Sequence, residues 1–307
     1  MTALALDIGA TKFAAALVDS AGAVGEPRRI AVPESEVWEA CRELLTEVVG
    51  DARVSAVGIG SAGPVDVGAG VCGPLNIPEW AEGFPIVDAV RKLFPEAEIR
   101  FAIDGVCLVL AEQRFGAARG VANVLAMTVS SGIGGGIISD NRVVMGRTGN
   151  AGHVGHIVVP GQDEPCACGG FGCVEAVASG KSSVRWARRQ GWTGTTGVEL
   201  AAAAHAGEPI AVAALQRAGT AIGTAVASAA ALLDTDLVVI GGGFAQSGEP
   251  LWGPLRTAAA AHARLKFLRG LRVVPSELTD QATLQGAAIL AFGAATAGET
   301  PRGRMTS

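Results

Sequence analysis

The chain contains no tyrosine, and phenylalanine and tryptophan bring the aromatic content to only 5%. No phenolic hydroxyl can therefore serve as an acid, a base or a nucleophile. Charged residues make up 17% of the chain, the net charge is −5, and no basic run stands out. This balance disfavours nucleic acid as a partner, because nucleic-acid binding depends on clustered Lys and Arg.

Long apolar runs are also missing. The closest approach, AIGTAVASAAALL, is shorter than the roughly 20 residues of a membrane span, so we expect a buried helix and no membrane partner. Met1 leads at once into the strand-like LALDIG, and we expect no signal peptide and a cytoplasmic, reduced protein. With 49% hydrophobic residues, the 307-residue chain has ample material for one large domain or two.

Three of the six cysteines lie close together, in GHIVVPGQDEPCACGGFGCVEA. Cys166, Cys168 and Cys173 have C-x-C-x4-C spacing, and His156 precedes them. Three thiolates and one imidazole in a glycine-rich stretch are typical of a closed tetrahedral zinc site. A disulfide and plain burial are the alternatives, but a reduced compartment favours metal. We therefore predict a structural zinc ion.

Strand-like and helical segments alternate along the chain, which predicts an α/β fold. The expected strands are LALDIG, FAAALVD, VSAVGIG, EIRFAID, VLAMTVSS, GGGIIS, DLVVIGGG and LRVVP, and the clearest helices span residues 35–49, 85–94, 105–118, 209–233, 254–265 and 281–295. Both halves open with an apolar strand, a small-residue turn and a second apolar strand. This approximate repeat predicts an N-terminal domain of residues 1–119 and a C-terminal domain of residues 120–307, with a ligand cleft between them. We place the zinc loop at residues 153–175 and expect a final helix, 281–298, to pack back on the first domain.

Three small-residue turns follow apolar strands. They comprise Asp7, Gly9, Ala10, Thr11 and Lys12 in the first, Ser130, Ser131, Gly132, Gly134 and Gly135 in the second, and Gly241, Gly242 and Gly243 in the third. Small residues let backbone N–H groups approach phosphate oxygens, and Asp7 can hold Mg²⁺ directly or through water. Each turn alone could be a plain hairpin, a flexible loop or a tight strand-to-helix turn. Their occurrence together predicts a nucleotide site.

Taken in order, these motifs resemble those of the ROK family, which comprises repressors and sugar kinases. The resemblance covers essentially the whole chain through D-x-G-x-T-K at Asp7, GIGSAGPVD, PLNIPEW, Asp104, SSGIGGG, AGHVGH, CACGGFGCVE and VIGGG. It implies a two-domain hexokinase/actin-like (ribonuclease H-like) fold and ATP-dependent phosphorylation of a hexose at O6. It also implies a homodimer or a homotetramer.

The resemblance also implies roles for individual residues. Asp104 would be the general base that takes the proton from the sugar O6, although alone it could be a helix N-cap. Asn76, His153, His156 and Glu175 would line the sugar, with His156 also holding zinc. Without the resemblance, Asn76 is a turn residue before Pro78, and Glu175 is a solvated carboxylate in a first helical turn.

Four positions depart from the family pattern. Ile103 and Val106 replace asparagines, and the asparagine at position 103 is implied to bind the O3/O4 side of the sugar. His153 replaces a glutamate at the O1/O2 end, a variant that resembles bacterial N-acetylmannosamine kinases. Ala10 replaces a glycine, which requires a negative φ there.

Removing a hydrogen-bonding partner of a sugar hydroxyl redirects substrate selection, so we expect an amino sugar, either kanosamine or N-acetylmannosamine. A glucokinase, a non-catalytic sugar sensor and a transcriptional repressor are the alternatives. Repressors of the family carry a helix-turn-helix domain ahead of the sugar-binding part. Here the first strand is expected to begin at Ala3, which disfavours the repressor.

Overall fold

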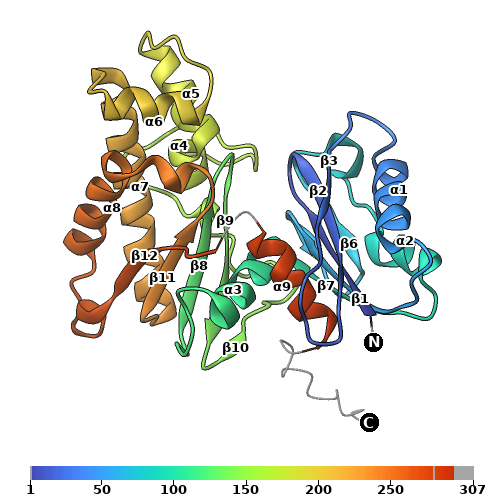
Figure 1. The fold of residues 1–307 in the computed structure, drawn as a ribbon. Coiled ribbons are helices and arrows are strands. Elements are labelled where there is room, and N and C mark those ends of the chain that lie inside the picture. Colours follow the sequence, from blue (N-terminus) through green and yellow to red (C-terminus); the bar gives the residue numbers. More distant parts are fainter. Residues whose placement is uncertain (1, 279–280, 294–307) are drawn as a thin grey trace, which may run out of the picture.

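The computed structural model describes residues 2–278 and 281–293, and they form two five-stranded sheets flanked by helices (Figure 1). The first sheet has the order β3-β2-β1-β4-β7 and the second the order β10-β9-β8-β11-β12. In each, a strand pairs antiparallel with the next one along the chain, and two further strands add in parallel. The shared topology explains the repeat in the sequence and confirms the α/β class.

The first sheet contains the strands expected from the apolar runs, together with one edge strand that the sequence did not reveal, β3. Its strands are β1 (Thr2–Ile8), β2 (Lys12–Val18), β3 (Arg28–Ala31), β4 (Val54–Ser61) and β7 (Glu98–Ile103), with helices α1 (Val37–Val49) and α2 (Ile86–Leu93) beside it. A small hairpin of β5 (Val65–Asp66) and β6 (Val71–Cys72) and the short helix η1 (Pro78–Trp80) lie between β4 and α2 in the chain.

The second sheet is drawn from green to orange in Figure 1. It is built from β8 (Val124–Val129), β9 (Ile133–Ser139), β10 (Arg142–Val143), β11 (Leu237–Gly241) and β12 (Arg272–Pro275), with helices α4 (Val174–Ala178), α5 (Gly180–Arg189), α6 (Gly197–His205), α7 (Pro209–Leu233) and α8 (Glu249–His262) and the short helices η2 (Val154–His156), η3 (Phe244–Ser247) and η4 (Lys266–Gly270). Helix α7 contains the long apolar run. By length and composition it could cross a membrane, but 61% of its most apolar window is buried inside the protein.

Two helices lie between the sheets (Figure 1). Helix α3 (Asp104–Phe115) follows β7 and packs against β8 and β9 of the second sheet. Helix α9 (Ala282–Ala291) follows β12 of the second sheet and packs against β1 and β4 of the first. Residues 294–298, expected in this last helix, lie outside the described residues. The chain thus crosses between its two halves twice.

Candidate functional site

The carboxyl ends of three parallel strands bring the first group of candidate residues to one sheet edge. Asp7 on β1 is paired in register with Gly60 on β4, and Ser61 at the end of β4 is paired with Ile103 at the end of β7. Asp104 follows directly and begins helix α3. Ligands of open α/β sheets bind at such carboxyl ends.

Two carboxylates with raised pKa values lie at this edge. Burial raises the pKa of Asp7 to about 7, and the nearby Asp104 adds to the rise while Lys12 and Arg29 oppose it. Burial likewise raises the pKa of Asp104 to about 6; the N–H of Gly105 opposes this shift and Glu175 adds to it. Desolvation disfavours a charged carboxylate, so both groups are poised to accept a proton or a cation.

Asp104 is the first residue of α3 rather than its N-cap, which is Ile103. Its Oδ1 nevertheless accepts a hydrogen bond of 2.7 Å from the N–H of Gly105, one of the free donors of the first turn. A side chain added at Gly134 would stand 4.0 Å from Asp104 Oδ1. The start of α3 therefore places the Asp104 carboxylate beside the second small-residue turn.

The glycines of SSGIGGG have a packing role that the sequence did not reveal. A Cβ on Gly136 would overlap the carbonyl oxygen of Gly105, and a Cβ on Gly105 would overlap that of Gly135. Strand β9 and the first turn of α3 are thus in backbone-to-backbone contact. Only glycine permits this approach, which fixes Asp104 against the second sheet.

The cysteine loop brings together the four predicted ligands. One ligand atom from each of His156, Cys166, Cys168 and Cys173 lies within 4.8 Å of the others. The Sγ atoms of Cys168 and Cys173 are 3.8 Å apart, and His156 Nδ1 is 3.7 Å from Cys166 Sγ. Tetrahedral zinc with bonds of about 2.3 Å to sulfur requires ligand separations of roughly 3.8 Å. The donor set and its geometry therefore fit zinc.

The same loop directs polar groups toward Asp104. Because Nδ1 of His156 faces the cysteines, its Nε2 is the nitrogen left for a ligand. Glu175, in the first turn of α4, accepts a 2.7 Å hydrogen bond from the N–H of Ile133 at the start of β9. It is therefore fixed against the second turn and is not a free solvated carboxylate.

His153 and Ile103, the two departures expected to affect specificity, are neighbours. A Cβ on Gly63 would stand 2.8 Å from both His153 Nε2 and Ile103 Cδ1. Nδ1 of His153 lies 3.0 Å from the carbonyl oxygen of Asn150 and donates to it, so Nε2 is a hydrogen-bond acceptor. Burial lowers the pKa of His153, which favours this neutral ring.

Asn76 lies in the loop between β6 and η1. Its side chain is exposed in the turn before η1 and has no hydrogen-bond partner within the described part of the chain.

The alanine at position 10, where the family pattern has glycine, causes no backbone strain. Within residues 2–278 and 281–293, the non-glycine residues with positive φ are Glu36, Asp140, Asn141 and Asp234, so Ala10 satisfies the expected requirement.

The second and third small-residue turns share one wall of a cavity of about 800 Å³. Ser130 and Ser131 follow β8, and Gly243 follows the neighbouring strand β11. Gly242 has a φ of +97° and lies against the backbone of Val129, so a side chain there would be both strained and crowded. The first turn, Asp7 to Lys12, does not reach this cavity.

Most of the cavity wall comes from residues that sequence reasoning missed. Helices α5 and α6, the two residues before α6 and the start of η3 supply Gly180, Lys181, Val184, Arg185, Arg188, Arg189, Thr195, Thr196, Gly197, Val198 and Phe244. Lys181, Arg185 and Arg188 recur at the spacing of one helix face. The spacing of basic residues in KSSVRWARR could have predicted a basic helix face. It could not have shown that this face lines the cavity.

Comparisons with known proteins identify the family. The ROK family model matches residues 3–294. A kanosamine kinase from Amycolatopsis mediterranei is 32% identical over 97% of this chain and 98% of its own length. An N-acetylmannosamine kinase from Citrobacter koseri is 35% identical over 79% of this chain and 83% of its own. A glucokinase from Streptomyces griseus, solved with glucose and AMPPNP, has a TM-score of 0.82, 30% identity, and coverage of 95% of this chain and all of that one.

The chain belongs to the ROK family. Its similarity to kinases along nearly its full length makes it a sugar kinase of that family. The two-sheet architecture is accordingly the actin-like ATPase fold, and this expectation from the sequence is confirmed.

Proposed function

We propose that this sugar kinase transfers the γ-phosphoryl group of ATP to the 6-hydroxyl of an amino hexose, with Asp104 as the general base. The observation that carries the proposal is the position of Asp104. It stands at a sheet edge beside Gly134 of a phosphate-type turn, and Glu175 from the zinc loop lies close enough to raise its pKa. A base, a phosphate cradle and a polar wall thus converge at one place.

In this mechanism Asp104 accepts the O6 proton as the hydroxyl attacks the γ-phosphorus in line. The hydrogen bond from Gly105 holds one carboxylate oxygen and leaves the other for the sugar. Backbone N–H groups at residues 131–132 and 10–11 are the proposed donors for the phosphate oxygens, since those of Gly9, Ser130 and Ile133 already donate within the protein. Gly241, Gly242 and Gly243 leave room for the adenosine at the cavity lined by Ser130 and Phe244.

Asp7 fits a role in holding Mg²⁺. It is buried beside a second carboxylate, and a divalent cation would relieve the repulsion that contributes to its raised pKa. Bound Mg²⁺ supplies charge neutralisation for the phosphates. Zinc in the cysteine loop would have a different task, since four protein ligands leave no open position for chemistry. Its ligands His156 and Cys173 would instead hold the sugar-facing wall, including Glu175.

The adjacency of Ile103 and His153 supports the amino sugar. Ile103 offers an apolar side chain, and the neighbouring His153 offers an imidazole acceptor whose Nδ1 already donates to Asn150. An acceptor beside an apolar surface suits a substrate N–H, as in kanosamine or N-acetylmannosamine. A 3-hydroxyl that lost its asparagine partner at position 103 would remain unpaired, which disfavours glucose relative to kanosamine, whereas the His153 acceptor at the O1/O2 end would favour the N–H at C2 of N-acetylmannosamine.

A sugar panel tests this specificity. We expect the kcat/KM for kanosamine or N-acetylmannosamine to exceed that for glucose at least about fivefold, since one unmatched hydrogen-bonding group costs on the order of 1–3 kcal/mol. ADP release should be measured with kanosamine, glucosamine, N-acetylmannosamine, N-acetylglucosamine, mannose and glucose. Ile103→Asn should raise the value for glucose, whereas the control Ile103→Val should not. A clear preference of the unmodified protein for glucose would show that it is a glucokinase.

The pH profile tests the base. Because Asp104 acts as a base only when ionised and its pKa is about 6, kcat/KM for the sugar should be constant above neutral pH. Below about pH 6 it should fall about tenfold per unit as the carboxylate becomes protonated. Initial rates at saturating Mg²⁺ and ATP between pH 5 and 8 measure this, and a flat profile down to pH 5 is incompatible with the role.

A further inference from the structure

The zinc loop continues directly into the wall of the nucleotide cavity. Cys173, a zinc-ligand candidate, is followed at once by α4, and Ser179 then caps α5 by accepting a hydrogen bond from the N–H of Ser182. The N–H of Gly180 donates to the carbonyl oxygen of Ser130 at 2.7 Å. The amino end of α5 is therefore fixed to the second small-residue turn.

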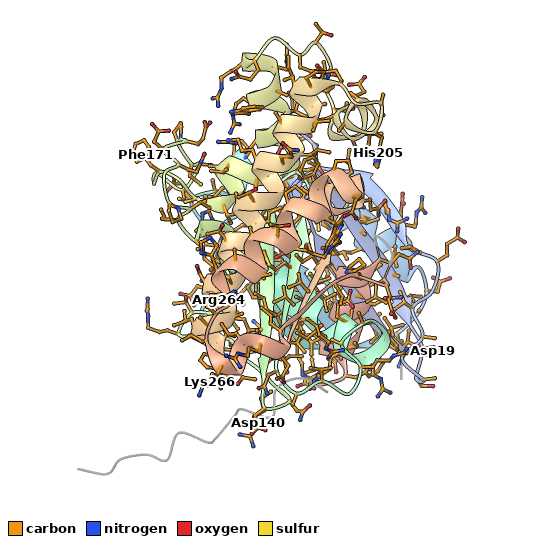
Figure 2. The ribbon with its side chains drawn as sticks, turned by 90° about the vertical axis from the view of Figure 1, so that its left-hand side faces the viewer. Asp19, Asp140, Phe171, His205, Arg264 and Lys266 are labelled. Atoms are coloured by element: carbon orange, nitrogen blue, oxygen red, sulfur yellow. The ribbon has the colours of Figure 1, made fainter. Side chains whose placement is uncertain are left out.

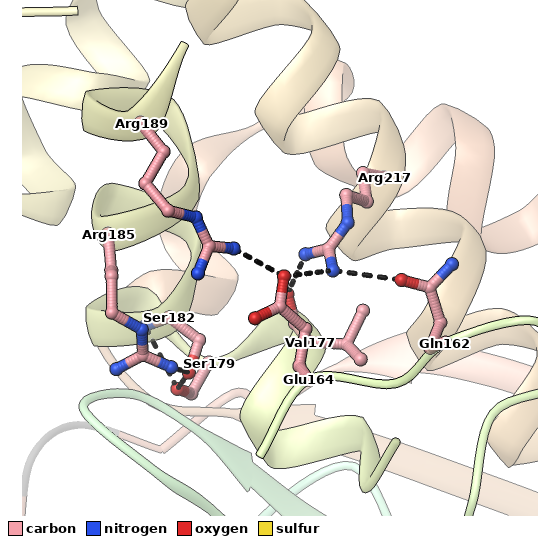
Figure 3. Close-up of polar contacts among 8 residues, drawn as sticks. All are labelled: Gln162, Glu164, Val177, Ser179, Ser182, Arg185, Arg189 and Arg217. Atoms are coloured by element: carbon pink, nitrogen blue, oxygen red, sulfur yellow. Dashed lines mark hydrogen bonds and ion pairs between the residues drawn. The ribbon is translucent and has the colours of Figure 1, made fainter. Parts of the chain in front are cut away.

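The carboxyl end of α5 is tied to the zinc loop by a second connection (Figure 3). Glu164, two residues before Cys166, accepts hydrogen bonds at the same oxygen from Arg189 in the last turn of α5 and from Arg217 on α7. Arg217 also donates to Gln162 at 2.8 Å and to the carbonyl of Val177 at 2.7 Å. One carboxylate thus joins the loop to two helices.

Burial makes this junction energetically significant. The side chains of Glu164 and Arg217 are only 13% and 17% exposed, so their charges are poorly screened by water. The guanidinium of Arg217 also lies 5.6 Å over the ring of Trp186 on α5. Arg189 is 48% exposed and lines the nucleotide cavity, as does Arg185 one turn earlier. Of the three charges, Arg189 is the one that faces the cavity.

We infer that Glu164 is a positioning residue for the nucleotide, acting through Arg189, and that this junction couples the zinc loop to nucleotide binding. The inference rests on the proposed function, because it assigns the cavity to the nucleotide. Zinc orders the loop that carries Glu164, and Glu164 holds the last turn of α5 at the cavity. By linkage, a nucleotide that orders α5 must in turn favour retention of zinc.

Nucleotide affinity tests the positioning role. Arg189→Gln and Glu164→Gln should each weaken MgADP binding to the zinc-loaded protein about fivefold, as expected for a partly exposed ion pair. Calorimetry should show an unchanged sugar Kd, and metal analysis should show unchanged zinc. The double variant should lose no more than either single variant, because both act through one contact. The control Glu249→Gln removes a carboxylate paired with Arg256 on exposed α8 and should change nothing.

Equal MgADP affinity in all these variants would overturn the inference and leave the proposed function intact, whereas a wild-type protein that binds no MgADP would overturn both. Arg189→Gln keeps the test valid if Glu164→Gln fails to fold, because Arg189 is the exposed partner. Zinc release to a chelator gives the reciprocal measurement. Saturating MgADP should slow release severalfold in the wild type and not in Arg189→Gln, and equal slowing in both would also overturn the coupling.

Discussion

Replacing Asp104 with asparagine should lower turnover by about 10²–10⁴-fold while the sugar Kd changes by less than about threefold. The amide keeps the size of the carboxylate and can still accept the hydrogen bond from Gly105. It cannot take a proton from O6, so the loss falls on kcat rather than on binding. Single-turnover rates and sugar calorimetry on the same preparation separate the two quantities.

The matched control is Glu112→Gln, eight residues further along α3. Glu112 is also a buried carboxylate, held by the N–H of Ala117 and by Ser276, which lies against Gly241 of the third small-residue turn. This variant changes a buried charge in the same helix about two turns from Asp104, and it should keep its turnover at saturating ATP. Unchanged turnover in Asp104→Asn would remove Asp104 from the role of base. Sugar binding without turnover in the unmodified protein would support the sensor alternative.

Replacing Cys168 with serine should reduce the zinc content from about one ion per chain to nearly none and weaken sugar binding at least about tenfold. Cys168 is exposed, so the change opens no cavity in the core and removes only a ligand. Without bound zinc, the loop that carries His156 and Glu175 would lose the ion that holds it in place, and these two residues would no longer be positioned for the sugar. Metal analysis and sugar calorimetry measure the two effects.

Cys41→Ala provides the control for this variant. Cys41 is fully buried in the first half of the chain, far in sequence from the loop, and its loss should lower stability without changing zinc. Full sugar affinity in a metal-free Cys168→Ser protein would contradict the structural role of zinc. Phe171, labelled at the outer edge of the molecule in Figure 2, is 65% exposed, so this part of the loop adds little apolar packing.

Local patterns in the sequence were enough to predict much of the fold and part of the candidate site. The apolar runs predicted β1, β4, β7, β8 and β11, and the ligand spacing predicted the cluster of His156 and the three cysteines, because both depend on residues near in sequence. The turns after β8 and β11 lie at one edge because parallel strands end together.

Tertiary contacts account for what the sequence could not reveal. Ile103 and His153 are 50 residues apart, and only the folded chain brings both against Gly63. The residues of α5 that line the cavity form no recognisable sequence motif. Glu164 and Arg217 are 53 residues apart, so their pairing could not be predicted from local sequence. Gly135 was interpreted only as part of a phosphate cradle, but its carbonyl oxygen also occupies the space that a side chain on Gly105 of α3 would need.

The position of α9 has a consequence for how the protein is made. This helix covers β1 and β4, which both lie within the first 61 residues to be synthesised, yet it is among the last segments to be made. Until translation reaches residue 291, the apolar face of the first sheet lacks its cover, so the N-terminal half cannot complete its core while the rest is being made. A nascent or truncated chain ending before Ala282 should therefore be a substrate for chaperones and proteases, even though every residue proposed to touch sugar or nucleotide is already present.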